Sequence, residues 1–358
     1  MNEVQPRLRP VLYNLGAFQT APVAITSAGR SYLLAANESP LGPLPSVAAA
    51  IAAAIGRINR YPDGEVTTLT GDIARWLGTS PERVVVGAGS VAAIQMLFEA
   101  VCDPDTEAIY AWRSFEAYPV LAKLAGMRPV AVPLRDERHD LNAMAAAVTP
   151  QTRLIIVCNP NNPTGTVVLR GELEEFLDQV PPDCLVLFDE AYREYVRDTS
   201  VPDALTLAAG RPNVVVVRTF SKAFGLAGLR IGYLVAHPAV AAEVRKTRLP
   251  YSVSHLAQVA AASSLRAEEE LLARVERTVK ERERVRRALL DLGWSIPESE
   301  ANFVWLRLNG ESADFATTCT VNGLNVRVVP GEGVRVSIGD PGANDTFLEV
   351  AAAYQRHR

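Results

Sequence analysis

Apolar and polar positions along the first two thirds of the chain follow the pattern of buried strands that alternate with helices. Seven short apolar runs, rich in β-branched residues and bounded by turns, are typical of strands buried on both faces. They are Val84–Val86, Ala108–Ala111, Val130–Pro133, Leu154–Cys158, Leu185–Phe188, Val214–Thr219 and Ile231–Ala236. Helical patterns precede or separate them at 46–58, 66–77 and 91–101, and from Phe115, Leu141 and Gly171. This alternation predicts an α/β fold with an open, mostly parallel sheet whose site lies at the strand ends.

The pattern changes after Pro250. Residues 267–291 form a long charged helix with an apolar stripe, and three short strands follow at Phe303–Leu308, Val326–Val329 and Val334–Ile338, with helices from Ser312 and Asn344. We therefore expect a large domain over 37–249 and a small α+β domain over 250–358, with the long helix as the bridge. Residues 1–36 read as an arm that packs with the small domain.

Composition narrows the class of protein. The 358 residues are 48% hydrophobic, and the net charge is −4 with both signs interspersed, so neither a nucleic-acid face nor a membrane-binding basic patch is expected. No apolar run approaches the roughly 20 residues of a membrane span, and the N-terminus lacks the apolar core of a signal peptide. Cys102, Cys158, Cys184 and Cys319 are widely spaced and read as reduced thiols, without a disulfide or metal framework. These features favour a cytoplasmic globular protein.

The first candidate for chemistry is a lone lysine, Lys222, in the polar loop between the runs 214–219 and 231–236. Thr219 and Ser221 precede it, and Arg230 follows eight residues later. An amine that forms a Schiff base with an aldehyde needs a desolvated pocket, where it loses its proton more readily. Hydroxyl groups and a guanidinium group suit a phosphate. This segment therefore contains the groups needed to bind a phosphorylated aldehyde.

Three further motifs follow strands. The strand, glycine turn and helix that begin at Val84 and include Ser90 favour phosphate binding, although the P-loop lysine and the third glycine of a dinucleotide fingerprint are absent. Asn162-Pro163-Thr164-Gly165 is equally compatible with a plain turn, and Asp189, in Asp189-Glu190-Ala191-Tyr192, with a helix cap. In this order, with the lysine segment, the motifs resemble those of fold-type I pyridoxal-phosphate (PLP) aminotransferases. That family implies a mostly parallel seven-stranded sheet with a smaller α+β domain, and PLP as cofactor.

Within that superfamily the chain resembles the histidinol-phosphate aminotransferase group, through the loop at Asn37, Tyr61-Pro62-Asp63 and the segment 225–232. It is more similar to actinobacterial-type aromatic amino acid aminotransferases, through 87–91 and 112–118. Val91 and Ala92 stand where many histidinol-phosphate enzymes have acidic residues. The resemblance implies amino transfer between an aromatic L-amino acid and a 2-oxo acid, with 2-oxoglutarate as the expected acceptor.

The same resemblance implies roles for individual residues. Lys222 would form the Schiff base and move the substrate proton, Asp189 would pair with the pyridinium nitrogen, and Tyr192 and Asn162 would bind the phenolic oxygen of the cofactor. Phe115 would stack on the ring. The groups expected at the phosphate are Ser90, the backbone N–H of Val91, Thr219, Ser221, Arg230 and, from the partner subunit of a homodimer, Tyr61.

Fewer residues match the family at the positions that bind the substrate. Arg335 matches the arginine that binds the substrate carboxylate or phosphate, and Arg327 matches a second arginine of the group. Asn37 and Phe18 are also expected near the substrate. The arm of many relatives has a Tyr-x-Pro-Gly element that covers the substrate, whereas residues 16–20 of this chain read Gly-Ala-Phe-Gln-Thr.

Three other activities fit parts of the pattern. One is histidinol-phosphate transamination, and another is transamination of an unusual amino acid in a biosynthetic cluster. A PLP-dependent decarboxylase or oxidase would use the same cofactor residues. A PLP-binding regulator would need a DNA-binding helix-turn-helix module, for which the sequence has no segment to spare.

Overall fold

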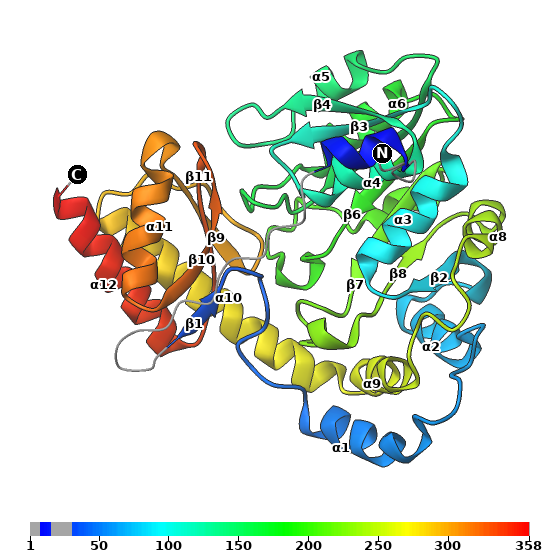
Figure 1. The fold of residues 1–358 in the computed structure, drawn as a ribbon, viewed down its shortest axis with the longest axis horizontal. Helices are drawn as coiled ribbons and strands as arrows, with labels where there is room; N and C mark the ends of the chain where they lie inside the picture. Colours follow the sequence, from blue (N-terminus) through cyan, green and yellow to red (C-terminus); the bar gives the residue numbers. More distant parts are fainter. Residues whose placement is uncertain (1–7, 16–30, 358) are drawn as a thin grey trace, which may run out of the picture.

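A computed structural model of the chain describes residues 8–15 and 31–357 and shows two parts built around separate sheets (Figure 1). The larger sheet has seven strands in the order β2-β8-β7-β6-β5-β3-β4. Its strands are β2 (Val84–Gly87), β3 (Glu107–Trp112), β4 (Arg128–Pro133), β5 (Thr152–Cys158), β6 (Leu185–Asp189), β7 (Val214–Thr219) and β8 (Gly232–Val235). Only β8 runs antiparallel to its neighbours β2 and β7. The predicted seven-stranded, mostly parallel sheet is therefore confirmed.

Both faces of this sheet are buried. Along β7, Val215 and Val217 pack toward one face, and Val214 and Val216 pack toward the other. The first face is covered by α3 (Ser90–Val101), α4 (Ala117–Ala125) and α8 (Pro238–Lys246). The second is covered by α5 (Leu141–Ala146), α6 (Arg170–Gln179) and α7 (Ala204–Ala208), and at its β2–β8 end by α2 (Thr67–Leu77) and α9 (His255–Arg266). Because both faces are covered, polar groups of this sheet reach a cavity only at the strand ends.

The smaller sheet has the order β1-β10-β11-β9. Its strands are β1 (Tyr32–Leu34), β9 (Phe303–Arg307), β10 (Leu324–Val329) and β11 (Gly333–Ser337), and its helices are α11 (Ser312–Val321) and α12 (Pro341–His357). Strand β1 pairs in parallel with β10, so the chain just before Asn37 belongs to this sheet. A 3-10 helix, η1 (Pro10–Asn14), lies instead beside α4, where Arg9 Nη1 donates to the carbonyl of Leu124 at 2.8 Å.

Helix α10 (Glu268–Asp291) runs from the large part to the small one (Figure 1). It follows α9, which packs against α1 (Pro45–Ala54) and α2. Helices α8 and α9 were not expected from the sequence: α9 is rich in Ala and Ser and buried over much of its surface, so it shows no polar face. The domain limits at residues 36 and 249 remain predictions.

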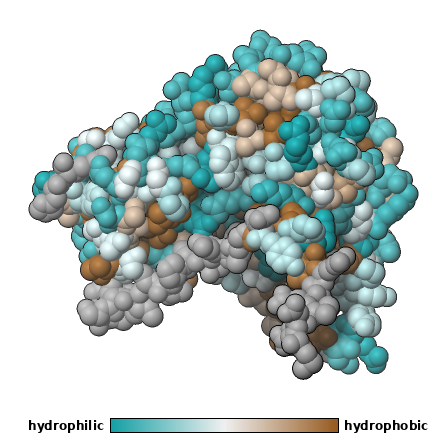
Figure 2. All heavy atoms as spheres, turned by 45° about the horizontal axis from the view of Figure 1, so that its top comes forward, coloured by the Kyte–Doolittle hydropathy of each residue, from teal (hydrophilic) through white to brown (hydrophobic). Residues whose placement is uncertain are grey.

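The cysteines, the surface and the helices give three further observations. The four cysteines are free thiols, and all but Cys102 are buried. The face in Figure 2 is mostly hydrophilic, with hydrophobic residues in separate small patches. Among residues 8–15 and 31–357, no helix combines the length and apolar character that crossing a membrane requires.

Candidate active site

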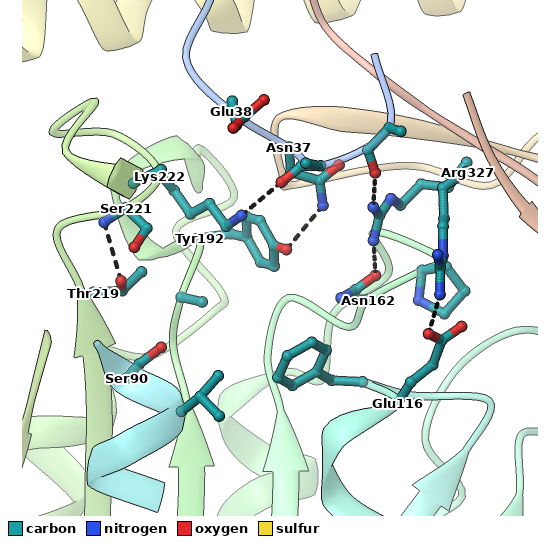
Figure 3. Close-up of a pocket in the computed structure, with 18 of the residues that line it drawn as sticks. Asn37, Glu38, Ser90, Glu116, Asn162, Tyr192, Thr219, Ser221, Lys222 and Arg327 are labelled. Atoms are coloured by element: carbon teal, nitrogen blue, oxygen red, sulfur yellow. Dashed lines mark hydrogen bonds and ion pairs between the residues drawn. The ribbon is translucent and has the colours of Figure 1, made fainter. Parts of the chain in front are cut away.

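A cavity of about 540 Å³ lies at the carboxyl ends of β5, β6 and β7, where they face β10 and β11 of the small sheet (Figure 3). This position follows from the topology, because parallel strands end at one edge and the chain between them forms loops there. The cavity volume is in the range of small-molecule sites. Thirteen of the fifteen predicted site residues line it: Asn37, Ser90, Val91, Phe115, Asn162, Asp189, Tyr192, Thr219, Ser221, Lys222, Arg230, Arg327 and Arg335.

Lys222 lies in the loop that follows β7, and its Nζ donates to the carbonyl of Ala36 at 2.8 Å. Loss of solvent around the amine lowers the pKa of Lys222 from 10.5 to about 7, and the positive charge of Arg335 acts in the same direction. A large fraction of the amine is therefore neutral near pH 7. A neutral amine is both a nucleophile and a base.

Asp189 ends β6 at the floor of the cavity. Burial raises the pKa of Asp189 to about 6, against the hydrogen bond that Tyr118 Oη donates to its Oδ2 at 2.7 Å. The backbone N–H of Ala191 donates to Oδ1 at 3.2 Å. A carboxylate that burial makes costly to ionise gains from a cationic N–H donor, so the site suits a protonated ring nitrogen.

An anion cradle lies at the start of α3. Gly89, with φ of 91°, precedes Ser90, and a Cβ on Gly89 would lie 2.5 Å from Nη2 of Arg230. A Cβ on Gly232 would lie 2.4 Å from the backbone nitrogen of Ser90. Both positions therefore require glycine if the guanidinium and the helix N-terminus are to stay where they are. Together with the hydroxyls of Thr219 and Ser221, this arrangement fits a phosphate group.

Asn37 and Tyr192 connect the two parts of the molecule above the cavity floor. Asn37 Nδ2 donates to Tyr192 Oη at 2.9 Å, and Ser337 Oγ donates to Asn37 Oδ1 at 2.9 Å. Asn302 Nδ2 also donates to the carbonyl of Asn37 at 3.0 Å. Burial raises the pKa of Tyr192 to about 12, so its phenol keeps its proton at neutral pH. Tyr192 is therefore a hydrogen-bond donor in a fixed place.

Arginines occupy the side of the cavity opposite Lys222. Arg327 pairs with Glu116 (Figure 3). Arg335 is buried, contacts the Asn162 side chain and the Ala35 carbonyl, and keeps a buried Nε without a hydrogen-bond partner among the described residues. A buried guanidinium with an unused donor is suited to bind an anion.

Two predicted residues are not placed in the cavity. Tyr61 is 82% exposed, does not line the cavity and stacks on Tyr251 with ring centroids 4.6 Å apart. Phe18 lies outside the described residues.

Sequence reasoning missed three groups that line the cavity or contact a residue that does. Tyr118 contacts Asp189, Glu116 pairs with Arg327, and Arg113 lines the cavity while its guanidinium pairs with Glu332. All three belong to the segment 112–118, from which only Phe115 received a role. No sequence pattern indicated these contacts, because Phe115 precedes α4 and its edge-to-face contact with Tyr118, at 5.5 Å between ring centroids, is formed only in the fold.

Comparisons with known proteins agree with this chemistry. A sequence model described as aminotransferase class I and II matches residues 31–350. An aromatic amino acid aminotransferase of Thermobifida fusca is 57% identical over 351 residues, covering 98% of each chain. Another from Streptomyces avermitilis is 50% identical over 357 residues, covering 99% of each.

A solved structure shares the fold. It is a histidinol-phosphate aminotransferase from Sinorhizobium meliloti in complex with pyridoxal-5'-phosphate, which is 28% identical, with a TM-score of 0.88 and 99% of each chain covered. The structural match supports the predicted α/β aminotransferase fold, and the family match spans nearly the whole chain. The chain belongs to the class I and II aminotransferase family and is a transaminase that acts on an amino donor and an oxo acid.

Proposed function

We propose that the protein is a PLP-dependent aminotransferase that moves an amino group between an aromatic L-amino acid and a 2-oxo acid, with 2-oxoglutarate as the expected acceptor. One observation carries the proposal: Lys222, with its lowered pKa, faces the same cavity as the buried Asp189 and the Gly89–Arg230 cradle. The relatives named aromatic amino acid aminotransferases support the substrate class.

The residues present fit each end of PLP. Ser90, Thr219, Ser221 and Arg230 would hold its phosphate, and Asp189 would hold the proton of its ring nitrogen. Tyr192 would donate to the phenolic oxygen, as would Nδ2 of Asn162, whose Oδ1 already accepts from Arg335. Phe115 would cover one ring face with a flat apolar surface.

Individual residues of the chain have separate roles in the reaction. When bound, PLP supplies the aldehyde that carries the amino group and a ring that draws electron density from the substrate Cα. Arg335 binds the substrate carboxylate and so orients the Cα–H bond. Lys222 Nζ takes the proton from Cα and later returns a proton, because its pKa near 7 allows both steps at neutral pH.

We also propose a homodimer in which Tyr61 reaches the phosphate site of the partner subunit. Its support is the exposure of large apolar side chains around this loop, namely Ile55, Ile58, Tyr61, Leu249 and Tyr251. Mixing inactive Tyr61→Ala protein with inactive Lys222→Ala protein should restore part of the activity through hybrid dimers. No recovery, with subunit exchange shown independently, would count against shared sites.

The substrate assignment is tested by a panel of amino donors. Phenylalanine, tyrosine, tryptophan, histidinol phosphate and non-aromatic amino acids are each offered to the yellow holoenzyme, and loss of the yellow absorbance and formation of the oxo acid are followed. We expect the aromatic amino acids to give the highest kcat/KM. Release of carbon dioxide or consumption of oxygen would indicate a decarboxylase or an oxidase instead.

A further inference from the structure

The side of the cavity opposite Lys222 has an unusual balance of charge. Three arginines line it: Arg113 from the large part, and Arg327 and Arg335 from neighbouring strands of the small sheet. Arg113 pairs with Glu332, and Arg327 pairs with Glu116. Among residues 8–15 and 31–357, these two ion pairs neutralise Arg113 and Arg327, so the group of three arginines and two glutamates carries one net positive charge.

Arg335 is the arginine of this set that keeps no carboxylate partner within residues 8–15 and 31–357. Its two contacts, the Asn162 side chain and the Ala35 carbonyl, are neutral. Arg327 and Glu116 both act electrostatically on Arg335. Burial lowers the pKa of Arg335, the positive charge of Arg327 lowers it further, and the negative charge of Glu116 raises it. Glu116 thus contributes to the potential that an anion on Arg335 would meet.

The pairing of β10 with β11 places Arg327 beside Arg335, so both arginines can interact with an anion bound there. Arg327 and Arg335 are directly opposed partners on the antiparallel strands β10 and β11, so both side chains project from one face of the small sheet. A ligand that draws both arginines must break or share the ion pair of Arg327 with Glu116. The side chains of Arg327 and Glu116 are 21% and 34% exposed, so solvent and its ions screen these two charges only partly.

The charge of the ligand decides what this arrangement favours. A carboxylate carries one negative charge, whereas a phosphate monoester carries about −1.5 to −2 at neutral pH. We propose that Glu116 is a specificity-determining residue that, by neutralising Arg327, selects substrates with a carboxylate over phosphate monoesters. This inference rests on the proposed function, because it assigns the anion site of that same cavity.

A plain bridging role would not have this effect. Glu116 belongs to the large part and Arg327 to the small one, so their ion pair also connects the two parts. Arg113 and Glu332 connect the same segment to the same hairpin with the orientation of charge reversed. Glu332 does not line the cavity. A Glu332→Gln variant is therefore a matched control for loss of a bridge.

The test measures anion preference without turnover. The holoenzyme is titrated by calorimetry with 3-phenylpropanoate and 3-phenylpropyl phosphate, which lack the reacting amino group. Wild type, Glu116→Gln, Glu116→Asp and Glu332→Gln are compared, with melting temperature and PLP content as controls. Electrostatic gain from removing a negative charge grows with the charge of the ligand. We expect Glu116→Gln to shift the ratio of Kd values toward the phosphate by roughly tenfold, or about 1.4 kcal/mol.

The outcomes separate the alternatives. We expect wild type to bind the carboxylate more tightly, and Glu116→Asp and Glu332→Gln to keep the wild-type ratio. An unchanged ratio in Glu116→Gln, or an equal shift in Glu332→Gln, would overturn the inference. A wild-type preference for the phosphate would also overturn it, even if the Glu116→Gln protein failed to fold. A wild type that binds PLP but transfers no amino group from aromatic donors would contradict the proposed function instead.

Discussion

Removing the Tyr118 hydroxyl tests how the chain controls Asp189. Tyr118 and Asp189 are both buried, and the phenol donates to Oδ2 at 2.7 Å. The pKa of Tyr118 is raised well above its usual 10, mainly by burial, so the phenol remains a donor throughout the accessible pH range. Tyr118→Phe removes this hydrogen bond, which stabilises the ionised form of Asp189 more than its protonated form.

The magnitude follows from that bond. A hydrogen bond to a charged group contributes roughly 1.5–3 kcal/mol, and one pKa unit corresponds to about 1.36 kcal/mol. The pKa of Asp189, about 6 in the cofactor-free protein, should therefore rise by roughly one to two units in Tyr118→Phe. The pKa of Asp189 is about 6 in the folded protein and 3.8 in the unfolded chain. Its contribution to the free energy of unfolding is therefore fully present below pH 3.8 and is lost as the pH rises through 6. The variant should therefore be destabilised more at pH 8 than at pH 5.

Infrared difference titration of the cofactor-free protein measures the change, with Asp189→Asn identifying the carboxyl signal. Tyr110→Phe is the matched control, because Tyr110 is buried in the same aromatic cluster with its ring centroid 6.3 Å from that of Tyr118. We expect a shift in Tyr118→Phe alone. An unchanged or lowered midpoint, or an equal shift in Tyr110→Phe, would refute the positioning role of Tyr118.

Three further predictions concern other parts of the cavity. Gly89→Ala should weaken PLP binding, measured by fluorescence titration, because the added Cβ would displace Arg230. Gly126→Ala is the control, because Gly126 has a similar φ of 96° but no atom lies within 4 Å of the added Cβ. This control should lose stability and keep its PLP affinity. Arg335→Ala should lower kcat/KM for phenylalanine by roughly 100-fold, as expected for a bidentate charged contact, and Arg327→Ala by much less; equal losses would contradict the carboxylate assignment. Lys222 has a folded pKa near 7 against 10.5 unfolded, so the cofactor-free protein should gain stability as pH rises from 7 toward 10 in urea denaturation, and Lys222→Met should abolish that slope.

Sequence patterns predicted the large sheet because each strand is an apolar run bounded by turn residues. Val214–Thr219 is the clearest case, since alternate valines face two covered sides. The motifs that follow β5, β6 and β7 were expected to meet because parallel strands end at one edge, and the cavity brings Asn162, Asp189 and Lys222 together there. Family resemblance supplied the roles that spacing alone leaves open.

Contacts between segments far apart in the chain were not predictable in this way. Glu116 and Arg327 are separated by 211 positions, and neither belongs to a pattern that indicates a partner. The pairing of β1 with β10 was missed because three residues are too short a run to show periodicity. Tyr118 reads as an ordinary core aromatic, and only the fold places its hydroxyl on Asp189.

The central claim is that Lys222 is the residue that carries the cofactor. Reduction of the purified yellow protein with borohydride, followed by peptide mapping, tests it directly, because the reduced bond fixes the cofactor to the amine that held it. We expect the label on the peptide that contains Lys222 and none on a Lys222→Ala protein treated in the same way. A label on Lys246 or Lys280, or no label on a protein that transfers amino groups, would contradict the account.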